Sequence, residues 1–253
     1  MDVRRRLFYL LSVVMGVTLV SHQGVAAQAL PRGAVIIEQR TLPAEPNRAL
    51  VLWMINPERS APIPEDDAYT CLDETRGNAY SGPTRVSLLN VSKNRIINTI
   101  EIRDPHFPGK DRFDLPFEIR SGYYYLVHSA DSKKARKPTI LNFQDLNGDG
   151  DAAEFVLYDA PFCMGLQTTL IGYSRQHDRV IQYPLEIEFR RGKERWTEKS
   201  VWLEYIFAEK PTAPGHFSFA VDYRGRGGSL VSYEVSYDQS LERFRGTCAV
   251  MEK

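Results

Sequence analysis

The sequence has little of what would mark a helical, nucleic-acid-binding or membrane-spanning protein. Beyond the first thirty or so residues, apolar residues keep a helical spacing for no more than about ten positions. The 32 basic residues balance 32 acidic ones, so the formal net charge is zero, and nothing electrostatic favours nucleic acid as a partner. The longest apolar run, from Leu7 to Val20, is shorter than the roughly 20 residues that a membrane-spanning helix needs.

Common catalytic motifs are also missing. The sequence contains no G-x-S-x-G elbow, no H-E-x-x-H pair and no phosphate-binding G-x-x-x-x-G-K-[ST] loop. The histidines beyond the first thirty residues stand singly, and no two have the spacing of metal ligands; they are His106, His128, His177 and His216. These absences favour a non-enzymatic protein over an enzyme.

Cysteine is scarce, with only Cys71, Cys163 and Cys248. In an oxidising compartment we expect two of them to form a disulfide and the third to be a buried structural thiol. Their spacing does not decide which two pair. Because no cysteine precedes Cys71, a lipid-modified cysteine at the start of an exported chain is excluded.

The first residues have the layout of a secretory signal peptide. Three arginines (residues 4–6) precede the apolar run, and small residues then allow cleavage after Ala27 or Ala29. We therefore expect residues 1–29 to be removed and residues 30–253 to form a single all-β domain. The predicted location is secreted or periplasmic, with no membrane span after cleavage.

An all-β fold follows from short segments in which Val, Ile, Tyr, Phe and Thr alternate with polar residues. Three hairpins share a pattern, a strand ending in a polar residue and a short turn before a second strand, around residues 90–97, 174–181 and 236–244. Repeated hairpins predict antiparallel four-stranded meander units, arranged as an incomplete propeller or as a β-sandwich. The possible units are 34–129, 139–189 and 200–250, and the strands expected in the middle unit are 139–145, 154–160, 168–174 and 179–189. Strands are also expected over residues 117–129 and 200–208.

One loop has the composition of a calcium site. Asp145, Asn147 and Asp149 carry side-chain oxygens at alternate positions, Gly150 permits a tight turn, and Asp151 follows where a backbone carbonyl can bind an ion. The loop leads into a strand and not a helix, so it is not an EF-hand. The alternative is an Asx-rich hairpin loop without metal, because Asn-Gly and Asp-Gly are also preferred turn sequences.

The stretch FQDLNGDGDAAEFVLYD (143–159) resembles the calcium loops of FG-GAP or VCBS-type repeats in integrin-like β-propellers. The resemblance covers about residues 139–189. It implies a structural calcium ion held by Asp145, Asn147, Asp149, the Asp151 carbonyl and a closing carboxylate. The closing residue here is Glu154, one position later than in the repeat pattern.

Two functions follow as expectations. The first is an exported, calcium-stabilised, non-enzymatic β protein that acts as a binding or scaffold module for a protein or carbohydrate ligand. The second is a secreted hydrolase whose site is built from loops 56–83 and 103–116, the latter containing Asp104, His106, Asp111 and Asp114. Aromatic residues such as Trp202, Tyr205 and Phe207 could form a ligand platform, but filling of the core is the favoured interpretation.

Overall fold

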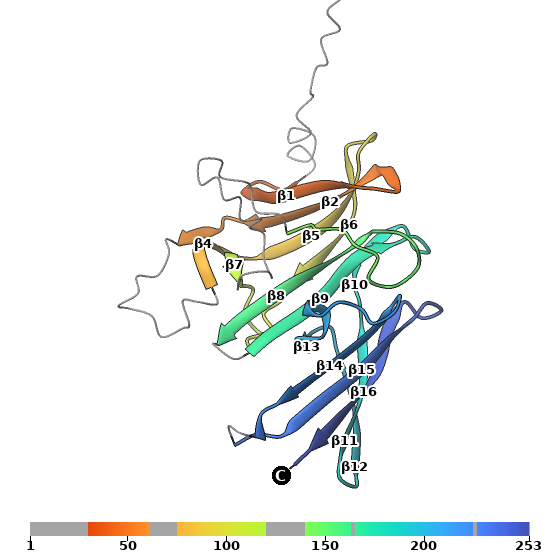
Figure 1. Cartoon of the computed structure of the whole chain (residues 1–253). Helices are drawn as coiled ribbons and strands as arrows, with labels where there is room; N and C mark the ends of the chain where they lie inside the picture. The colour runs from red at the N-terminus through yellow and green to blue at the C-terminus, as the bar shows by residue number, and fades with distance from the viewer. Residues whose placement is uncertain (1–29, 61–74, 120–139, 163–164, 225–226, 253) are drawn as a thin grey trace, which may run out of the picture.

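The protein is built from β-strands, as predicted. The computed structural model describes residues 30–60, 75–119, 140–162, 165–224 and 227–252 (Figure 1). Within these ranges the only helical segment is one turn of 3-10 helix, η2 (Ile206–Ala208). No helix in the described part of the chain is long and apolar enough to cross a membrane.

The first sheet is an antiparallel meander, and a second, small sheet is formed by two strands that come between β2 and β5 in the chain and by one that follows β6. The order of the first sheet is β1-β2-β5-β6, and the small sheet has the order β3-β4-β7. Strand β2 buries side chains on both of its faces. Leu50, Leu52 and Met54 face one hydrophobic cluster, and Ala49, Val51 and Trp53 another. The strands are β1 (Ala34–Leu42), β2 (Glu45–Ile55), β3 (Glu58–Ser60), β4 (Thr75–Gly82), β5 (Thr84–Asn90), β6 (Arg95–Ile102) and β7 (Phe113–Ile119).

The next sheet is centred on β9, which pairs with β8 along one edge and with β10 and then β13 along the other. The last sheet has the order β12-β11-β16-β15-β14, and β11 runs parallel to β16. The strands are β8 (Glu154–Phe162), β9 (Gly165–Ser174), β10 (Arg179–Gln182), β11 (Leu185–Arg191), β12 (Glu194–Ser200), β13 (Leu203–Glu204), β14 (His216–Asp222), β15 (Leu230–Asp238) and β16 (Arg243–Met251).

The four-stranded meander predicted for residues 139–189 is wrong in two of its strands. The segment expected as one strand over 179–189 is divided into β10 and β11, which belong to different sheets. The division falls at Tyr183 and Pro184, because proline has no N–H to donate to a ladder. At the other end, residues 140–145 form only an isolated bridge between Gln144 and Glu154.

The strand predicted over residues 200–208 is also wrong. This segment contains the two-residue strand β13 followed by η2. Tyr205, which begins the helical turn, has a positive φ of 55°, a conformation that ends an extended strand. Most of the strand predicted over residues 117–129 lies outside the described residues.

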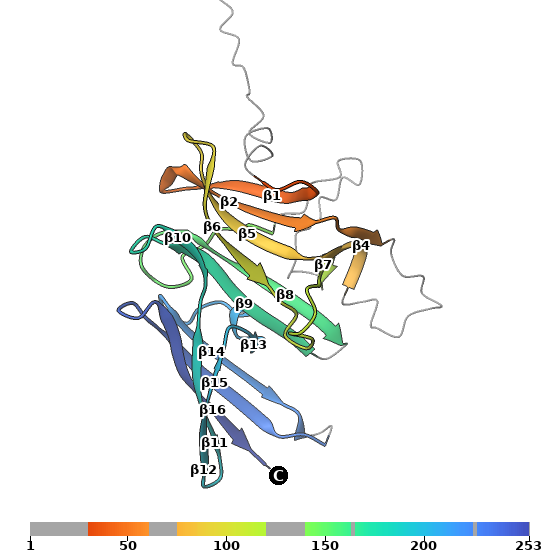
Figure 2. The same cartoon turned by 180° about the vertical axis from the view of Figure 1, so that it is seen from behind.

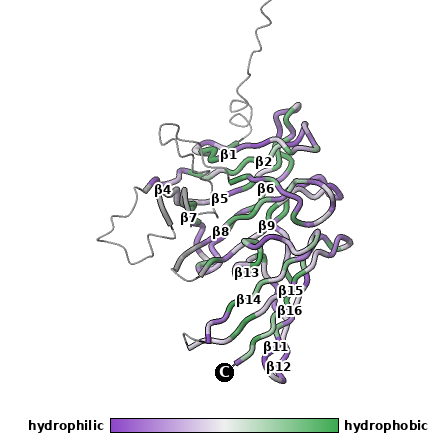
Figure 3. Tube along the Cα trace, viewed as in Figure 1, coloured by the Kyte–Doolittle hydropathy of each residue, from purple (hydrophilic) through white to green (hydrophobic). Residues whose placement is uncertain are grey.

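The sheets pack in layers. One hydrophobic cluster joins the first sheet to the β9 sheet, with Leu52 and Phe155 among its fully buried members. A second joins the opposite face of the β9 sheet to the five-stranded sheet, through residues such as Leu170 and Phe244. Figures 1 and 2 show the five-stranded sheet at the far end of this stack, and Figure 3 shows the apolar residues gathered in the strands. The described strands thus form stacked layers without a closed propeller.

The predicted likeness of three hairpins is confirmed. The β5–β6, β9–β10 and β15–β16 hairpins each have a four-residue turn whose last residue has a positive φ. All three turns lie on the same side of the molecule, at the right in Figure 1. The positive-φ residues are Asn94 (43°), Asp178 (47°) and Glu242 (44°). Asn and Asp tolerate this conformation best, which accounts for two of the three.

Candidate metal centre in the acidic loop

The acidic loop, residues 145–153, lies between the β9 sheet and the five-stranded sheet. Backbone hydrogen bonds in both directions between Gln144 and Glu154 (2.8 and 3.1 Å) close it at its base. Gly148 has a φ of 77°, and a Cβ placed there would lie 2.5 Å from the carbonyl carbon of Pro214. Glycine is therefore required by both the backbone conformation and the close approach to the next layer.

The acidic and amide side chains fold the loop by accepting hydrogen bonds from its own backbone. Asp145 accepts from the N–H groups of the two loop glycines, at 2.8 and 3.0 Å. Asn147 Oδ1 accepts from the N–H of Asp149, and Asp149 Oδ1 from the N–H of Asp151, both at 2.9 Å. The last two hydrogen bonds form successive Asx turns. These turns fix the backbone of the loop around its oxygen-bearing side chains.

Glu154 extends beneath this loop. Its side chain has no exposed surface. Oε2 accepts from the Leu146 N–H at 3.1 Å, and Oε1 accepts from Asn147 Nδ2 and from the Tyr183 hydroxyl, both at 3.3 Å. The carboxyl group therefore faces the loop although it stands one position later than in the repeat pattern.

The environment of Glu154 disfavours its ionised form. Burial, followed by the negative charges of Asp149 and Asp145, raises the pKa of this carboxyl to about 8, although hydrogen bonds from the backbone N–H groups of Leu146 and Asn147 favour the ionised form. A bound cation would remove this repulsion and favour the ionised form.

The donor atoms suit calcium, with one rearrangement. Carboxylate, amide and carbonyl oxygens are the hard ligands that calcium takes. At present the Asn147 amide nitrogen stands between two carboxylates, 3.0 Å from Asp149 Oδ2 and 3.3 Å from Glu154 Oε1. Turning the amide over presents its oxygen instead. Among the described residues, no three Asp, Glu, His or Cys side chains form a metal-binding group by themselves, so Asn147 and the Asp151 carbonyl are needed to complete the set.

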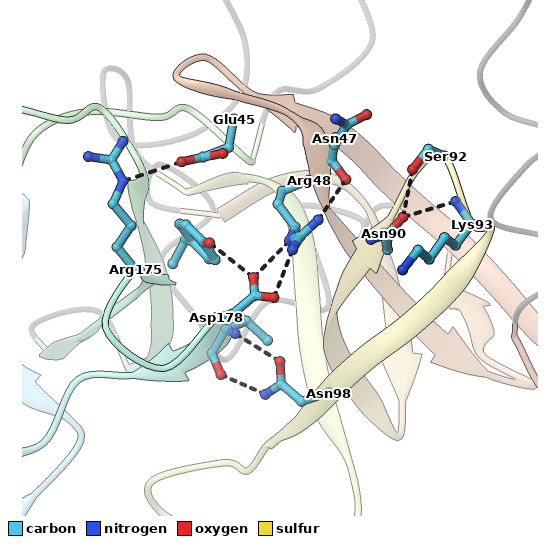
Figure 4. Close-up of polar contacts among 11 residues, drawn as sticks. Glu45, Asn47, Arg48, Asn90, Ser92, Lys93, Asn98, Arg175 and Asp178 are labelled. Atoms are coloured by element: carbon cyan, nitrogen blue, oxygen red, sulfur yellow. Dashed lines mark hydrogen bonds and ion pairs between the residues drawn. The ribbon is translucent and has the colours of Figure 1, made fainter.

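The Asp151 carboxylate points elsewhere. It forms an ion pair with Arg175 of the β9–β10 turn. Arg175 Nε also lies 3.4 Å from Glu45 Oε1 at the start of β2 (Figure 4). The backbone carbonyl of Asp151 accepts one hydrogen bond, from the Ala153 N–H at 3.0 Å. The Asp151 carboxylate is thus engaged by Arg175, and the assignment of its carbonyl to an ion stays a prediction.

A ring stack ties the loop to the five-stranded sheet. Tyr183, which donates to Glu154, packs edge-on against Tyr237 and Phe244 at centroid distances of 5.7 and 5.8 Å. Burial raises the pKa of the Tyr183 hydroxyl, so it remains a proton donor. A displacement of Glu154 would therefore also alter the packing of Tyr183 in the core between the two layers.

A second polar cluster, absent from the sequence predictions, joins the first sheet to the β9–β10 hairpin (Figure 4). Arg48 donates two hydrogen bonds of 2.7 Å to Asp178, and the Tyr173 hydroxyl donates a third at 3.0 Å. The Arg48 guanidinium holds the pKa of Asp178 below its usual value. The Asn98 side chain exchanges two hydrogen bonds with the Val180 backbone, at 2.8 and 2.9 Å. This cluster fixes neighbouring layers and presents no reactive group.

The loops named for the hydrolase alternative contact each other and strand β8. Ser81 Oγ donates a hydrogen bond to Asp114 Oδ1, and Glu58 Oε2 lies 3.5 Å from Arg112 Nη2. His106 Nε2 lies 3.6 Å from Asp159 Oδ2, and Asp159 was not among the predicted site residues. Burial, followed by the charges of Asp104 and Asp114, raises the pKa of Asp159 to about 7. Asp111 instead pairs with an arginine of β5 at 3.2 Å. Residues 61–74 of the other loop lie outside the described residues.

The remaining predicted residues behave as core. Cys248 is a buried, free thiol, whereas Cys71 and Cys163 lie outside the described residues. Trp202, Tyr205 and Phe207 are no more than 8% exposed, so the expectation that they fill the core is confirmed.

Comparisons with protein-family models, with curated proteins and with solved structures found no match to this chain. The likeness of the acidic loop to FG-GAP or VCBS-type repeats therefore stays a local resemblance.

Proposed function

We propose that the protein is an exported, calcium-stabilised, non-enzymatic β protein that acts as a binding or scaffold module. The observation that carries the calcium assignment is the placement of Glu154, a fully buried carboxyl group directed at a loop that already holds Asp145 and Asp149. Export to the periplasm or the exterior is supported by the leader at residues 1–29.

Calcium would act here as a structural ion. A buried ionised carboxylate is unfavourable without a counter-charge, and a divalent cation held by the loop oxygens above Glu154, with those of Asn147 and the Asp151 carbonyl among them, would supply one. The loop packs against Gly215 and, through Tyr183, against the five-stranded sheet. Closing the loop around an ion therefore stabilises the junction of two layers.

Thermal unfolding with calcium and with a chelator tests this proposal. At a calcium concentration 100 times the Kd, linkage predicts about 2.7 kcal/mol of added stability. Asp149→Asn should abolish most of the gain. Asp151→Asn is the matched control in the same loop, because only its carbonyl is assigned to the ion, and it should keep the gain. No shift in the unaltered protein at several millimolar calcium, or an equal shift in Asp149→Asn, contradicts the proposal.

A second candidate, the secreted hydrolase, is favoured by one observation, the contact between His106 and Asp159. An imidazole beside a carboxyl group of raised pKa is a common acid–base arrangement. The test is hydrolysis of p-nitrophenyl esters and glycosides by the unaltered protein and by Asp159→Asn. Turnover that disappears in the variant supports the hydrolase, and no turnover by the unaltered protein rejects it for these substrate classes.

A further inference from the structure

An open groove lies where the end of β6 and the turn after it (residues 101–108) approach Gln182, the end of β12 and the two residues that follow it (residues 199–202). Its volume is about 550 Å³, within the range of about 300–1,000 Å³ typical of small-molecule sites. It also lies between layers of the fold, a common position for ligand sites. Its floor has an apolar component, from Pro105, Pro108 and Val201.

Most charged groups of this groove already have partners. Glu101 lies 3.2 Å from Arg85 and 2.8 Å from Arg103. Asp104 accepts two backbone N–H groups of its own turn, at 2.7 and 3.0 Å. Lys199 has no ion pair or hydrogen bond with any described residue. Of the two cations that line the groove, Lys199 is thus the one without an acidic partner among the described residues, and its ammonium is available to an anion.

Trp202 supplies a second donor. The residue is only 8% exposed, and its ring is held in place by stacking on Phe113 at a centroid distance of 5.7 Å. Its backbone N–H donates to Ser200 Oγ at 3.0 Å, but its indole N–H donates to no group in the described part of the chain. The indole nitrogen is also not among the buried side-chain atoms that lack a partner, so this N–H is open to solvent on a residue that lines the groove and is free to donate to a ligand.

We propose that this groove binds a small organic carboxylate with a compact ring, of the sugar-acid class. The Lys199 ammonium and the Trp202 indole N–H serve as donors for the carboxylate, while the proline rings and Val201 contact the body of the ligand. The inference rests on the binding half of the proposed function, to which it adds a site and a ligand class. It does not depend on calcium.

Isothermal titration with three probes separates the parts of this proposal. Glucuronate carries both the ring and the carboxylate, glucose has the ring alone, and acetate has the carboxylate alone. We expect saturable binding of glucuronate, weaker binding of acetate and none of glucose. Lys199→Gln should weaken glucuronate binding at least about tenfold, which corresponds to about 1.4 kcal/mol. Trp202→Phe, which keeps a ring against Phe113, should weaken it severalfold.

Lys193→Gln is the matched control, because this exposed lysine lies in the turn of the same β11–β12 hairpin and should leave affinity unchanged. Equal affinity for glucose, unchanged binding by Lys199→Gln, or no glucuronate binding at tens of millimolar overturns the proposal. The titrations are run with calcium and with a chelator. Loss of glucuronate binding alongside an intact calcium-dependent thermal shift rejects the groove alone, and the reverse result rejects the calcium site alone.

Discussion

Replacing Glu154 with glutamine should change how the stability of the metal-free protein depends on pH. The carboxyl group is fully buried and its pKa is raised from 4.5 to about 8. Between these two values the unfolded chain releases the proton that the folded chain keeps. The free energy of unfolding therefore falls as pH rises, by up to about 1.4 kcal/mol per pH unit from this group, and levels off above the folded pKa.

Glutamine resembles the protonated acid in shape and in having a donor. Glu154→Gln should thus match the unaltered protein near pH 5 in stability and become progressively more stable than it as the pH approaches 8. Asp159 titrates with the same sign, and its pKa is raised to about 7, so it contributes equally to both proteins and cancels in the difference. The interval from pH 7 to 8 isolates Glu154 from Asp159.

The assay is urea unfolding in the presence of a chelator at several pH values, followed by circular dichroism. Parallel pH profiles for the two proteins, or an unaltered protein that remains the more stable one at pH 8, would refute the assignment of Glu154 as a buried acid of raised pKa. With saturating calcium the order should reverse, because the ion stabilises the ionised carboxylate that the variant lacks.

Three further results are expected. Gly148→Ala should lower the free energy of unfolding by about 2–4 kcal/mol, because it adds overpacking to an unfavourable positive φ. Gly150→Ala, whose Cβ would have nothing within 4 Å, should lower it by only about 1 kcal/mol. Equal losses of the two variants in urea titrations would contradict this. Arg48→Gln should lower the free energy of unfolding by about 1 kcal/mol, since its ion pair with Asp178 is partly exposed (21% and 45%). An unchanged urea midpoint would contradict a stabilising role for this pair. Thiol titration of the exported protein should detect no reactive group when folded and one, Cys248, after denaturation without reductant; three would disprove the predicted disulfide.

Local features of this fold were predictable from the sequence. The all-β class follows from residue alternation, and the common turn of the three hairpins follows from short polar segments with Asn94 and Asp178 at the positive-φ position. The Asx turns of the acidic loop also follow from the sequence, because they form between residues two positions apart. These properties depend on residues only a few positions apart.

Pairings between distant segments were not predictable. Pro184 indicates a break between β10 and β11, but nothing local shows that β11 then runs parallel to β16 in another sheet. Arg48 and Asp178 are 130 positions apart, and Asp159 becomes a partner of His106 only when β8 reaches the loop after β6. Burial of Glu154 between two layers likewise depends on how the sheets stack, which periodicity along one strand does not report.

Direct titration of the metal-free protein with calcium tests the central claim most closely. If Glu154 closes the acidic loop around an ion, calorimetry should show one saturable site in the unaltered protein and in Asp151→Asn, and at least tenfold weaker binding in Glu154→Gln. No saturable binding in the unaltered protein, or equal affinity in Glu154→Gln, would contradict the claim.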